Sequence, residues 1–184
     1  PLSFPSNCPN RKMCGIVGIL SKNEAAPLLV DSLKRLEYRG NDSAGIATIS
    51  EGKIQRRRAV GKLVQLSDLL VHQPLTGKSG IGHTRWATHG KPSLANAHPH
   101  SAGRVSVVHN GIIENYKELR AELLESGNVF HTETDTEIVA ILTEYKLSVG
   151  DSPLDAVRDC LTKLKGTFAL CFIFEGEDNL MIAT

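Results

Sequence analysis

The order of the predicted secondary structure elements constrains the fold of this chain more than any other sequence feature. Apolar segments of strand length dominate both ends, and helical segments dominate the middle. Strands are predicted over residues 14–20, 44–50, 79–88, 104–110, 166–174 and 179–184. The "EGK" segment at 51–53 suits a hairpin turn. Strands followed by helices and again by strands predict an α+β fold with a mostly antiparallel sheet.

Four helices are predicted from apolar spacing and from start signals. Leu29, Leu33 and Leu36 mark one helix face between the first two strands. Start signals open the other three helices: Asn115 with Glu118, Thr134 with Glu137, and Ser152 followed by Pro153. Gly127 and Gly150 end the first two of these. The last helix carries an apolar face formed by Leu154, Val157, Leu161 and Leu164.

Length and composition exclude several classes of protein. The 184 residues suit one domain, and 21 basic against 20 acidic residues give a net charge of +1, so charge favours neither nucleic acid nor a membrane surface. The basic run Arg56–Arg58 is interpreted as a solvated strand face, with a phosphate site as the less favoured alternative. Four cysteines without CxxC spacing indicate a reducing, cytoplasmic setting. The longest apolar stretch, 168–174, is too short to span a bilayer.

The two ends of the sequence suggest a domain within a longer protein. Residues 1–13 contain no apolar signal region, so we expect a disordered or removed leader, or an artefact of the assigned gene start. The predicted strand 179–184 runs to the last residue, which suggests that the domain continues beyond it. Cys14 directly follows Met13, so it is either an ordinary buried thiol or the first residue of the working protein.

Three further segments carry residues suited to chemistry. Arg85 lies in a glycine-bounded segment and could clamp a carboxylate with its planar guanidinium. Asn110-Gly111 is either a hairpin turn or, before a helix start, an amide and a backbone N–H placed as an oxyanion hole. Asp135, near a helix start, could bind an ammonium. A metal site formed by Cys14 and histidines is not favoured, because their spacing matches no zinc pattern.

These residue types together suit attack on an amino acid amide. Arg85 and Asp135 would hold the carboxylate and the amine of a zwitterion while a thiol attacks the side-chain carbonyl. The attack needs a general base. A free α-amine, whose ordinary pKa is about 7.7–8.0, would serve if Cys14 were the first residue.

Five sequence blocks resemble one enzyme family over residues 13–184. The blocks are "MCGIVGIL", "RLEYRGNDSAG", "GIGHTRWATHGKPSLANAHPH", "VVHNGIIENY" and "TETDTE". In this order they resemble the glutaminase domain, a class II glutamine amidotransferase, of the isomerising glutamine–fructose-6-phosphate aminotransferases. The resemblance implies a four-layer αββα sandwich of the N-terminal-nucleophile hydrolase type. It also implies hydrolysis of glutamine to glutamate and ammonia through a thioester.

The resemblance assigns a role to each motif residue. Cys14 is expected to be the nucleophile with its own amine as base, and Asn110 with the Gly111 backbone the oxyanion hole. The glutamine pocket is expected to contain Arg85, Trp86, Thr88, His89, His98 and Asp135. Trp86 is also expected to gate ammonia passage, and Arg39 and Gly40 to support the nucleophile loop. No cofactor or metal is implied.

The resemblance also implies partners, and the sequence departs from the family pattern in two places. Ammonia would pass to a sugar-phosphate isomerase domain that is absent from residues 14–184, and the full-length enzyme would be a cytoplasmic homodimer without nucleic-acid or membrane partners. Asn41 replaces a tyrosine of the family pattern, and residues 1–13 block the amine of Cys14, so the chain as written is expected to be inactive. The alternatives are the glutaminase domain of another amidotransferase, such as amidophosphoribosyltransferase, or a non-catalytic glutamine-binding domain.

Overall fold

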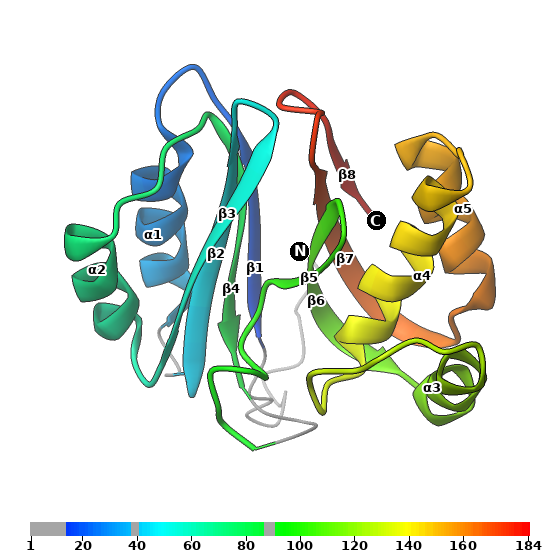
Figure 1. Ribbon diagram of the computed structural model, residues 1–184. Helices are drawn as coiled ribbons and strands as arrows, with labels where there is room; N and C mark the ends of the chain where they lie inside the picture. The colour runs from blue at the N-terminus through cyan, green and yellow to red at the C-terminus, as the bar shows by residue number, and fades with distance from the viewer. Residues whose placement is uncertain (1–13, 38–40, 87–90) are drawn as a thin grey trace, which may run out of the picture.

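Two four-stranded antiparallel sheets face each other at the centre of the protein (Figure 1). This computed structural model describes residues 14–37, 41–86 and 91–184. Sheet 1 has the strand order β1 (Gly15–Leu20), β4 (Ser79–Arg85), β2 (Ser43–Ser50) and β3 (Lys53–Val60). Sheet 2 has the strand order β5 (His100–Ala102), β6 (Val105–Ile113), β7 (Gly166–Phe174) and β8 (Met181–Ala183).

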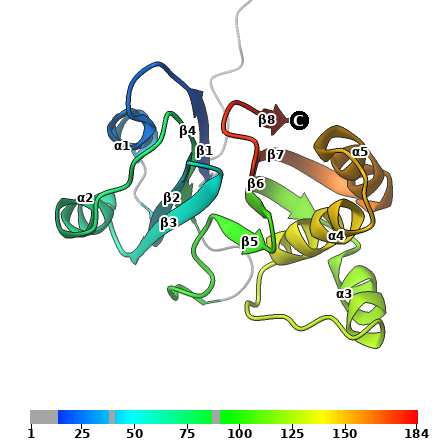
Figure 2. The same ribbon diagram turned by 45° about the horizontal axis from the view of Figure 1, so that its top comes forward.

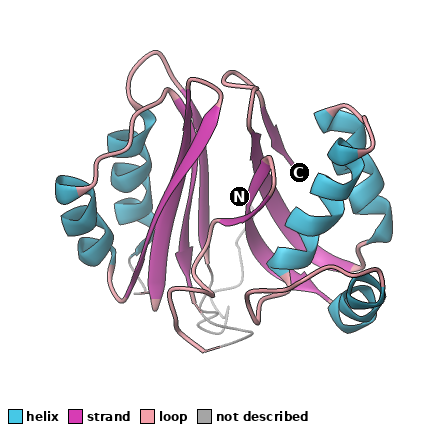
Figure 3. Cartoon of the chain, in the orientation of Figure 1, coloured by secondary structure: helices cyan, strands magenta, loops and turns pink. Residues whose placement is uncertain are grey.

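Helices cover the outer faces of both sheets (Figure 3). Helices α1 (Ala25–Leu36) and α2 (Leu63–His72) pack on sheet 1. Helices α4 (Thr136–Ser148) and α5 (Pro153–Lys163) lie outside sheet 2, and α3 (Tyr116–Glu125) packs beside α4. No helix in the described ranges is both long enough and apolar enough to cross a bilayer. The layer order is helix, sheet, sheet, helix, which confirms the predicted α+β sandwich.

Three apolar clusters explain why these layers assemble. On β2, Ile46 packs into the cluster under α1 and α2, whereas Ala47 packs between the sheets. Strand β2 is therefore buried on both faces, because each face is covered by another layer. Gly18 on β1 shows how closely the sheets approach: a Cβ there would lie 2.8 Å from the Cys171 Sγ atom of sheet 2.

Most of the predicted elements exist, but some boundaries differ. The strand expected over 79–88 ends at Arg85 in the described residues, and the strand expected over 104–110 continues to Ile113. Helix α2 and the short strand β5 were not predicted from the sequence. Glu37, from the end of α1, accepts a hydrogen bond of 2.8 Å from the Leu63 N–H at the start of α2. The start signal of α2 is therefore distant in sequence.

The predicted helix starts had different outcomes. Ser152 caps α5 as expected, because its hydroxyl accepts the Asp155 N–H at 3.2 Å. The Asn115 side chain does not cap α3; it bonds Lys163 O and Lys165 N instead. Two residues of the predicted apolar helix faces are partly exposed: Leu36 is 39% and Leu154 is 46% exposed.

The start of α4 also differs from the prediction. The helix begins at Thr136, not at Thr134. Glu137 makes no capping box, because its carboxylate accepts the backbone N–H groups of His131 and Thr132, each at 2.8 Å. The acidic side chain therefore organises the loop before the helix.

Candidate active site

Cys14 lies immediately before β1 and is held by the backbone that follows β4. The Trp86 N–H donates to Cys14 Sγ at 3.3 Å, and the thiol donates to Trp86 O at 3.5 Å. Strands β1 and β4 are antiparallel neighbours with Gly15 opposite Thr84, so pairing brings Cys14 to the end of β4. The two motifs that the sequence singled out, around Cys14 and around Arg85, are thus adjacent.

The surroundings of Cys14 hold its thiol in the protonated form. Burial raises the pKa of the thiol. The Trp86 N–H and the Arg85 charge lower this pKa, the Asp42 carboxylate raises it, and the net shift is upward. A protonated thiol is a weak nucleophile, so attack by Cys14 requires a base that accepts its proton.

Asp42 positions Arg85, a contact that was not predicted from the sequence. Arg85 Nη1 lies 3.4 Å from Asp42 Oδ1, and the Asp42 N–H donates to Arg85 O at 2.9 Å. Arg85 is only 3% exposed. The one sequence signal is that Asp42 directly precedes a strand. Its neighbour Asn41 donates to Gly61 O at 2.7 Å, so the residue that departs from the family pattern bonds to the turn before α2.

Strand alternation directs three of the predicted residues toward the same layer. The apolar cluster between the sheets includes one residue from each of β1, β4 and β6: Ile16, Ile81 and Val108. Successive side chains of a strand point to opposite faces. Cys14, Arg85 and Asn110 lie an even number of residues from these positions, so all three face the space between the sheets.

Asn110 and Gly111 lie inside β6, which rules out the hairpin turn and changes only where the pair sits relative to the strand. They are neither a hairpin turn nor the residues after a strand, because Asn110 pairs with Ala169 and Gly111 with Phe168 of β7. Gly111 has φ +136°, and a Cβ there would overlap Thr167 O. Only glycine accommodates this backbone. The amide side chain and the Gly111 N–H are therefore held by a sheet.

Asp135 is tied to the end of β6. Its Oδ2 atom accepts the Ile113 N–H at 3.0 Å, and its Oδ1 atom lies 3.6 Å from His109 Nδ1. The residue is the N-cap of α4 but makes no side-chain cap hydrogen bond, and it is 5% exposed. Asp135 is thus held at the end of β6 by the backbone N–H of Ile113, two residues after Gly111.

Buried histidines join the two sheets behind these residues. His83 Nε2 donates to His109 O at 2.9 Å, which links β4 to β6. The His83 ring stacks on His98, with centroids 4.0 Å apart. The Thr136 hydroxyl lies 2.8 Å from His98 Nε2 and 2.9 Å from His109 Nδ1, and it donates to Asp135 Oδ1 at 3.5 Å. His98, predicted to line the glutamine pocket, is 6% exposed in this cluster.

Burial keeps the rings of His83, His98 and His100 neutral. Desolvation lowers the pKa of His83 to about 3 and lowers the pKa values of His98 and His100 well below 6.5. In the described residues, no group of three or more His, Cys, Asp or Glu side chains is placed to hold a metal ion. Of the predicted site residues, Arg39, Gly40, Thr88 and His89 lie outside the described ranges.

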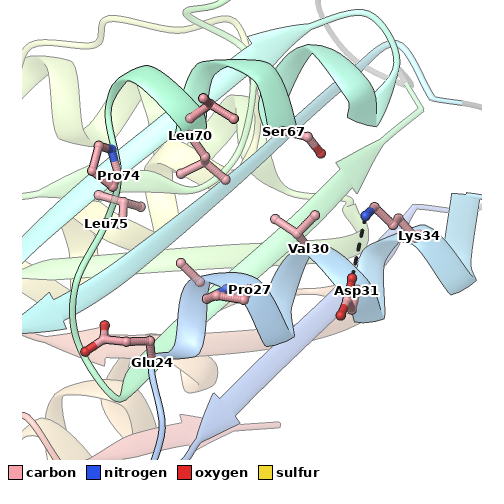
Figure 4. Close-up of a pocket in the computed structure, with 11 residues that line it drawn as sticks. Glu24, Pro27, Val30, Asp31, Lys34, Ser67, Leu70, Pro74 and Leu75 are labelled. Carbon is pink, nitrogen blue, oxygen red and sulfur yellow. Dashed lines mark ion pairs between the residues drawn. The ribbon is translucent and has the colours of Figure 1, made fainter.

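A mostly apolar groove elsewhere lacks the chemistry of this site. It has a volume of about 410 Å³ and lies between α1 and α2, on the outer face of sheet 1 (Figure 4). Its lining is mostly apolar. Its charged residues are Glu24, Asp31 and Lys34, and the last two pair with each other at 3.6 Å. No thiol, amide or arginine lines it. The candidate active site is therefore the cluster around Cys14.

Comparison with a family sequence model decides the class of this domain. The family described as "Glutamine amidotransferase domain" matches residues 83–184, which is more than half of the chain. The chain belongs to this glutamine amidotransferase family. The match contains Arg85, Asn110, Gly111 and Asp135, and Cys14 lies outside it.

Curated relatives and solved structures narrow the comparison. The chain is 62% identical over 170 residues to the isomerising glutamine–fructose-6-phosphate aminotransferase of Brucella suis, and 61% identical to that of Bradyrhizobium diazoefficiens. Each alignment covers 92% of this chain and 28% of the relative, so the chain spans under a third of their length. A glutamine PRPP amidotransferase structure from B. subtilis is 28% identical with a TM-score of 0.76, over 87% of this chain and 35% of that one. The higher identity favours the isomerising aminotransferase family over the amidophosphoribosyltransferase alternative.

Proposed function

We propose that the domain hydrolyses glutamine to glutamate and ammonia, with Cys14 as an N-terminal nucleophile. The observation that carries this proposal is the common orientation of Cys14, Arg85 and Asn110 toward the layer between the sheets. The thiol next to β1, the cation at the end of β4 and the amide donor on β6 all face this layer. Such an arrangement suits acyl transfer better than it suits a purely structural role.

The proposed reaction begins with the protonated thiol. The α-amine of Cys14, once residues 1–13 are removed, takes the thiol proton while Sγ attacks the side-chain carbonyl carbon of glutamine. The Asn110 amide and the Gly111 N–H stabilise the oxyanion that forms. Collapse of the tetrahedral intermediate breaks the C–N bond, and the ammonium proton transfers to the leaving nitrogen to give ammonia and a thioester. Water then hydrolyses the thioester to glutamate and restores the thiol.

Arg85 and Asp135 are proposed to select the substrate. The Arg85 guanidinium, oriented by Asp42, would bind the α-carboxylate, and the Asp135 carboxylate would bind the α-amine. Both side chains are almost fully buried and fixed by protein contacts, so little ordering remains for binding. Trp86, Thr88, His89 and His98 are proposed to line the pocket, and Arg39 and Gly40 to support the nucleophile loop.

In a longer protein, the ammonia would be passed on to a sugar-phosphate isomerase domain and used to convert fructose 6-phosphate to glucosamine 6-phosphate. The names of the relatives support this proposal. We further propose that the enzyme acts as a homodimer in the cytoplasm, with Trp86 gating ammonia transfer.

The test compares chains that begin at Cys14 with the chain that retains residues 1–13. Glutamate release from glutamine should be found only in the former. Cys14→Ala should abolish it, whereas Cys160→Ala, which removes a thiol buried in α5, should retain it. Full activity in Cys14→Ala would refute the assignment. Glutamine binding without hydrolysis in the chain that begins at Cys14 would instead support a non-catalytic glutamine-binding domain.

A further inference from the structure

A polar cavity lies between the edge strands of the two sheets. It has a volume of about 220 Å³ and is lined by Arg56, Arg58, Ala95, His100, Ser101, His131, Thr132 and Glu137. We name it the basic cavity. Strands β3 and β5, which contribute to it, are edge strands on the same side of the sandwich (Figure 2). One ordered water needs only about 10–15 Å³ of such volume, so a larger guest fits.

The arginines of this cavity are not the solvated strand face that the sequence suggested. Arg56 and Arg58 are half-buried. Arg56 Nη1 donates to Pro99 O at 2.8 Å, and Arg58 Nη1 donates to Ala97 O at 2.8 Å and Ala95 O at 3.2 Å. Arg57 alternates to the other face, where its Nε atom donates to Gln73 O. Two of three consecutive arginines thus point into one cavity.

The two cavity arginines lack a neutralising partner. Among the residues that the structure describes, no carboxylate forms an ion pair with either guanidinium. Each guanidinium carries five N–H donors, and the hydrogen bonds above use one nitrogen of each. Burial lowers the pKa of both side chains, and the Arg56 charge contributes to lowering that of Arg58 to about 10. Both remain charged at neutral pH, so two like charges share a partly desolvated space.

The other polar groups of the cavity do not fully neutralise the charge of the two arginines. Glu137 supplies one negative charge, but its oxygens already accept the His131 N–H, the Thr132 N–H and, at 2.7 Å, the Thr132 hydroxyl. One carboxylate against two guanidiniums leaves a net charge of +1. His131 is exposed at the rim and would add charge when protonated. The cavity therefore presents unused guanidinium donors and an excess of positive charge.

We propose that the basic cavity binds a phosphate-type oxyanion, either free or as the phosphate of a monoester, through Arg56 and Arg58. Planar guanidinium groups match the oxygens of phosphate in spacing and charge. A bound anion would offset the repulsion between the two arginines. His100, which lines the cavity, lies 3.2 Å from the Thr134 hydroxyl, and Thr134 directly precedes Asp135. The cavity thus adjoins the proposed amine-binding residue, but the proposal does not depend on glutaminase activity.

The test measures binding of inorganic phosphate by isothermal titration calorimetry, with chloride at matched ionic strength as the reference. Arg56→Gln and Arg58→Gln should each raise the Kd for phosphate about 10- to 100-fold, the loss expected for one charged hydrogen-bond partner. The matched control Arg57→Gln removes the same charge from the opposite face and should leave the Kd unchanged. Equal losses in all three variants would mean general surface electrostatics and would overturn the proposal.

A second measurement uses the unaltered protein, in case a variant does not fold. Phenylglyoxal modifies arginine side chains, and peptide mass spectrometry resolves the position modified. Phosphate should protect Arg56 and Arg58 and leave Arg57 as reactive as in chloride. Protection by fructose 6-phosphate as well would identify a monoester site, and protection by inorganic phosphate alone would identify a free-anion site. Absence of saturable protection by either probe would overturn the proposal.

Discussion

Mild acid should destabilise this protein through its buried histidines. His83, His98 and His100 are 0%, 6% and 2% exposed, and burial lowers the pKa of each ring. Below the unfolded pKa of about 6.5, the unfolded chain binds protons that the folded chain refuses. Their contribution to stability is therefore complete above pH 6.5 and is lost as the pH falls toward the folded pKa.

The size of the effect follows from His83. Its pKa is about 3 in the folded protein and 6.5 when unfolded. A pH of 5 lies about 1.5 units below the unfolded pKa. Protonation therefore stabilises the unfolded state by about 2 kcal/mol, at roughly 1.4 kcal/mol per unit. His98 and His100 act in the same direction. Carboxylates titrate mostly below this window, since their ordinary pKa values are about 4. A loss of this size is a large part of a typical stability of about 5–15 kcal/mol.

The assay is urea unfolding followed by far-UV circular dichroism at pH 7, 6 and 5. The wild-type free energy of unfolding should fall by at least about 2 kcal/mol between pH 7 and pH 5. His83→Gln keeps an N–H donor for His109 O but cannot titrate, so its fall should be smaller by about 2 kcal/mol. His72→Gln, which removes an exposed histidine from α2, should behave as the wild type does.

Two results would refute this reasoning. The first is a wild-type stability that stays constant between pH 7 and pH 5. The second is a His83→Gln variant that loses as much stability as the wild type over the same range. Either result would mean that the buried rings are protonated in the folded protein or are hydrated, contrary to the observed packing.

Three further predictions concern the proposed glutaminase site. Asn110→Ala should lower kcat about 10²–10³-fold with little change in KM, because an oxyanion donor acts on charge that develops in the transition state; a rise in KM alone would make Asn110 a binding residue. Arg85→Lys should lower kcat/KM for glutamine strongly, because an ammonium cannot reproduce the planar fork, and wild-type kinetics in this variant would contradict the role. Asp42→Asn should lower the pKa of the Cys14 thiol, since the carboxylate raises it; the pH midpoint of iodoacetamide alkylation of Cys14 should shift downward, and an unchanged midpoint would contradict the assigned electrostatics.

The sequence by itself determined most of the element types and the motif residues, and its resemblance to one family implied the order of the layers. Short apolar segments predicted the central strands, and the Ser152-Pro153 pair predicted the start of α5, because both signals act over a few neighbouring residues. The resemblance of five short blocks to one family pointed to Cys14, Asn110 and Asp135 as site residues. Once the strands are known, the alternation of side chains shows which residues of a strand share a face of its sheet.

Only the tertiary structure decided which distant groups became partners. Glu37 starts α2 from 26 positions away, and Asp42 orients Arg85 from 43 positions away. Asn115 and Glu137 look like helix caps in the sequence. In the structure they bond to backbone groups at the end of α5 and in the loop before α4, because these groups compete for the same side chains.

The same limit explains Arg56 and Arg58. A run of three arginines looks solvated in the sequence, and strand alternation alone does not show what covers either face. The loop that leads into β5 encloses one face, so the two arginines that point there become desolvated while Arg57 lies on the other. Local sequence fixes the direction of a side chain relative to its own strand. The packing of segments remote in sequence fixes its burial, its charge environment and hence its chemistry.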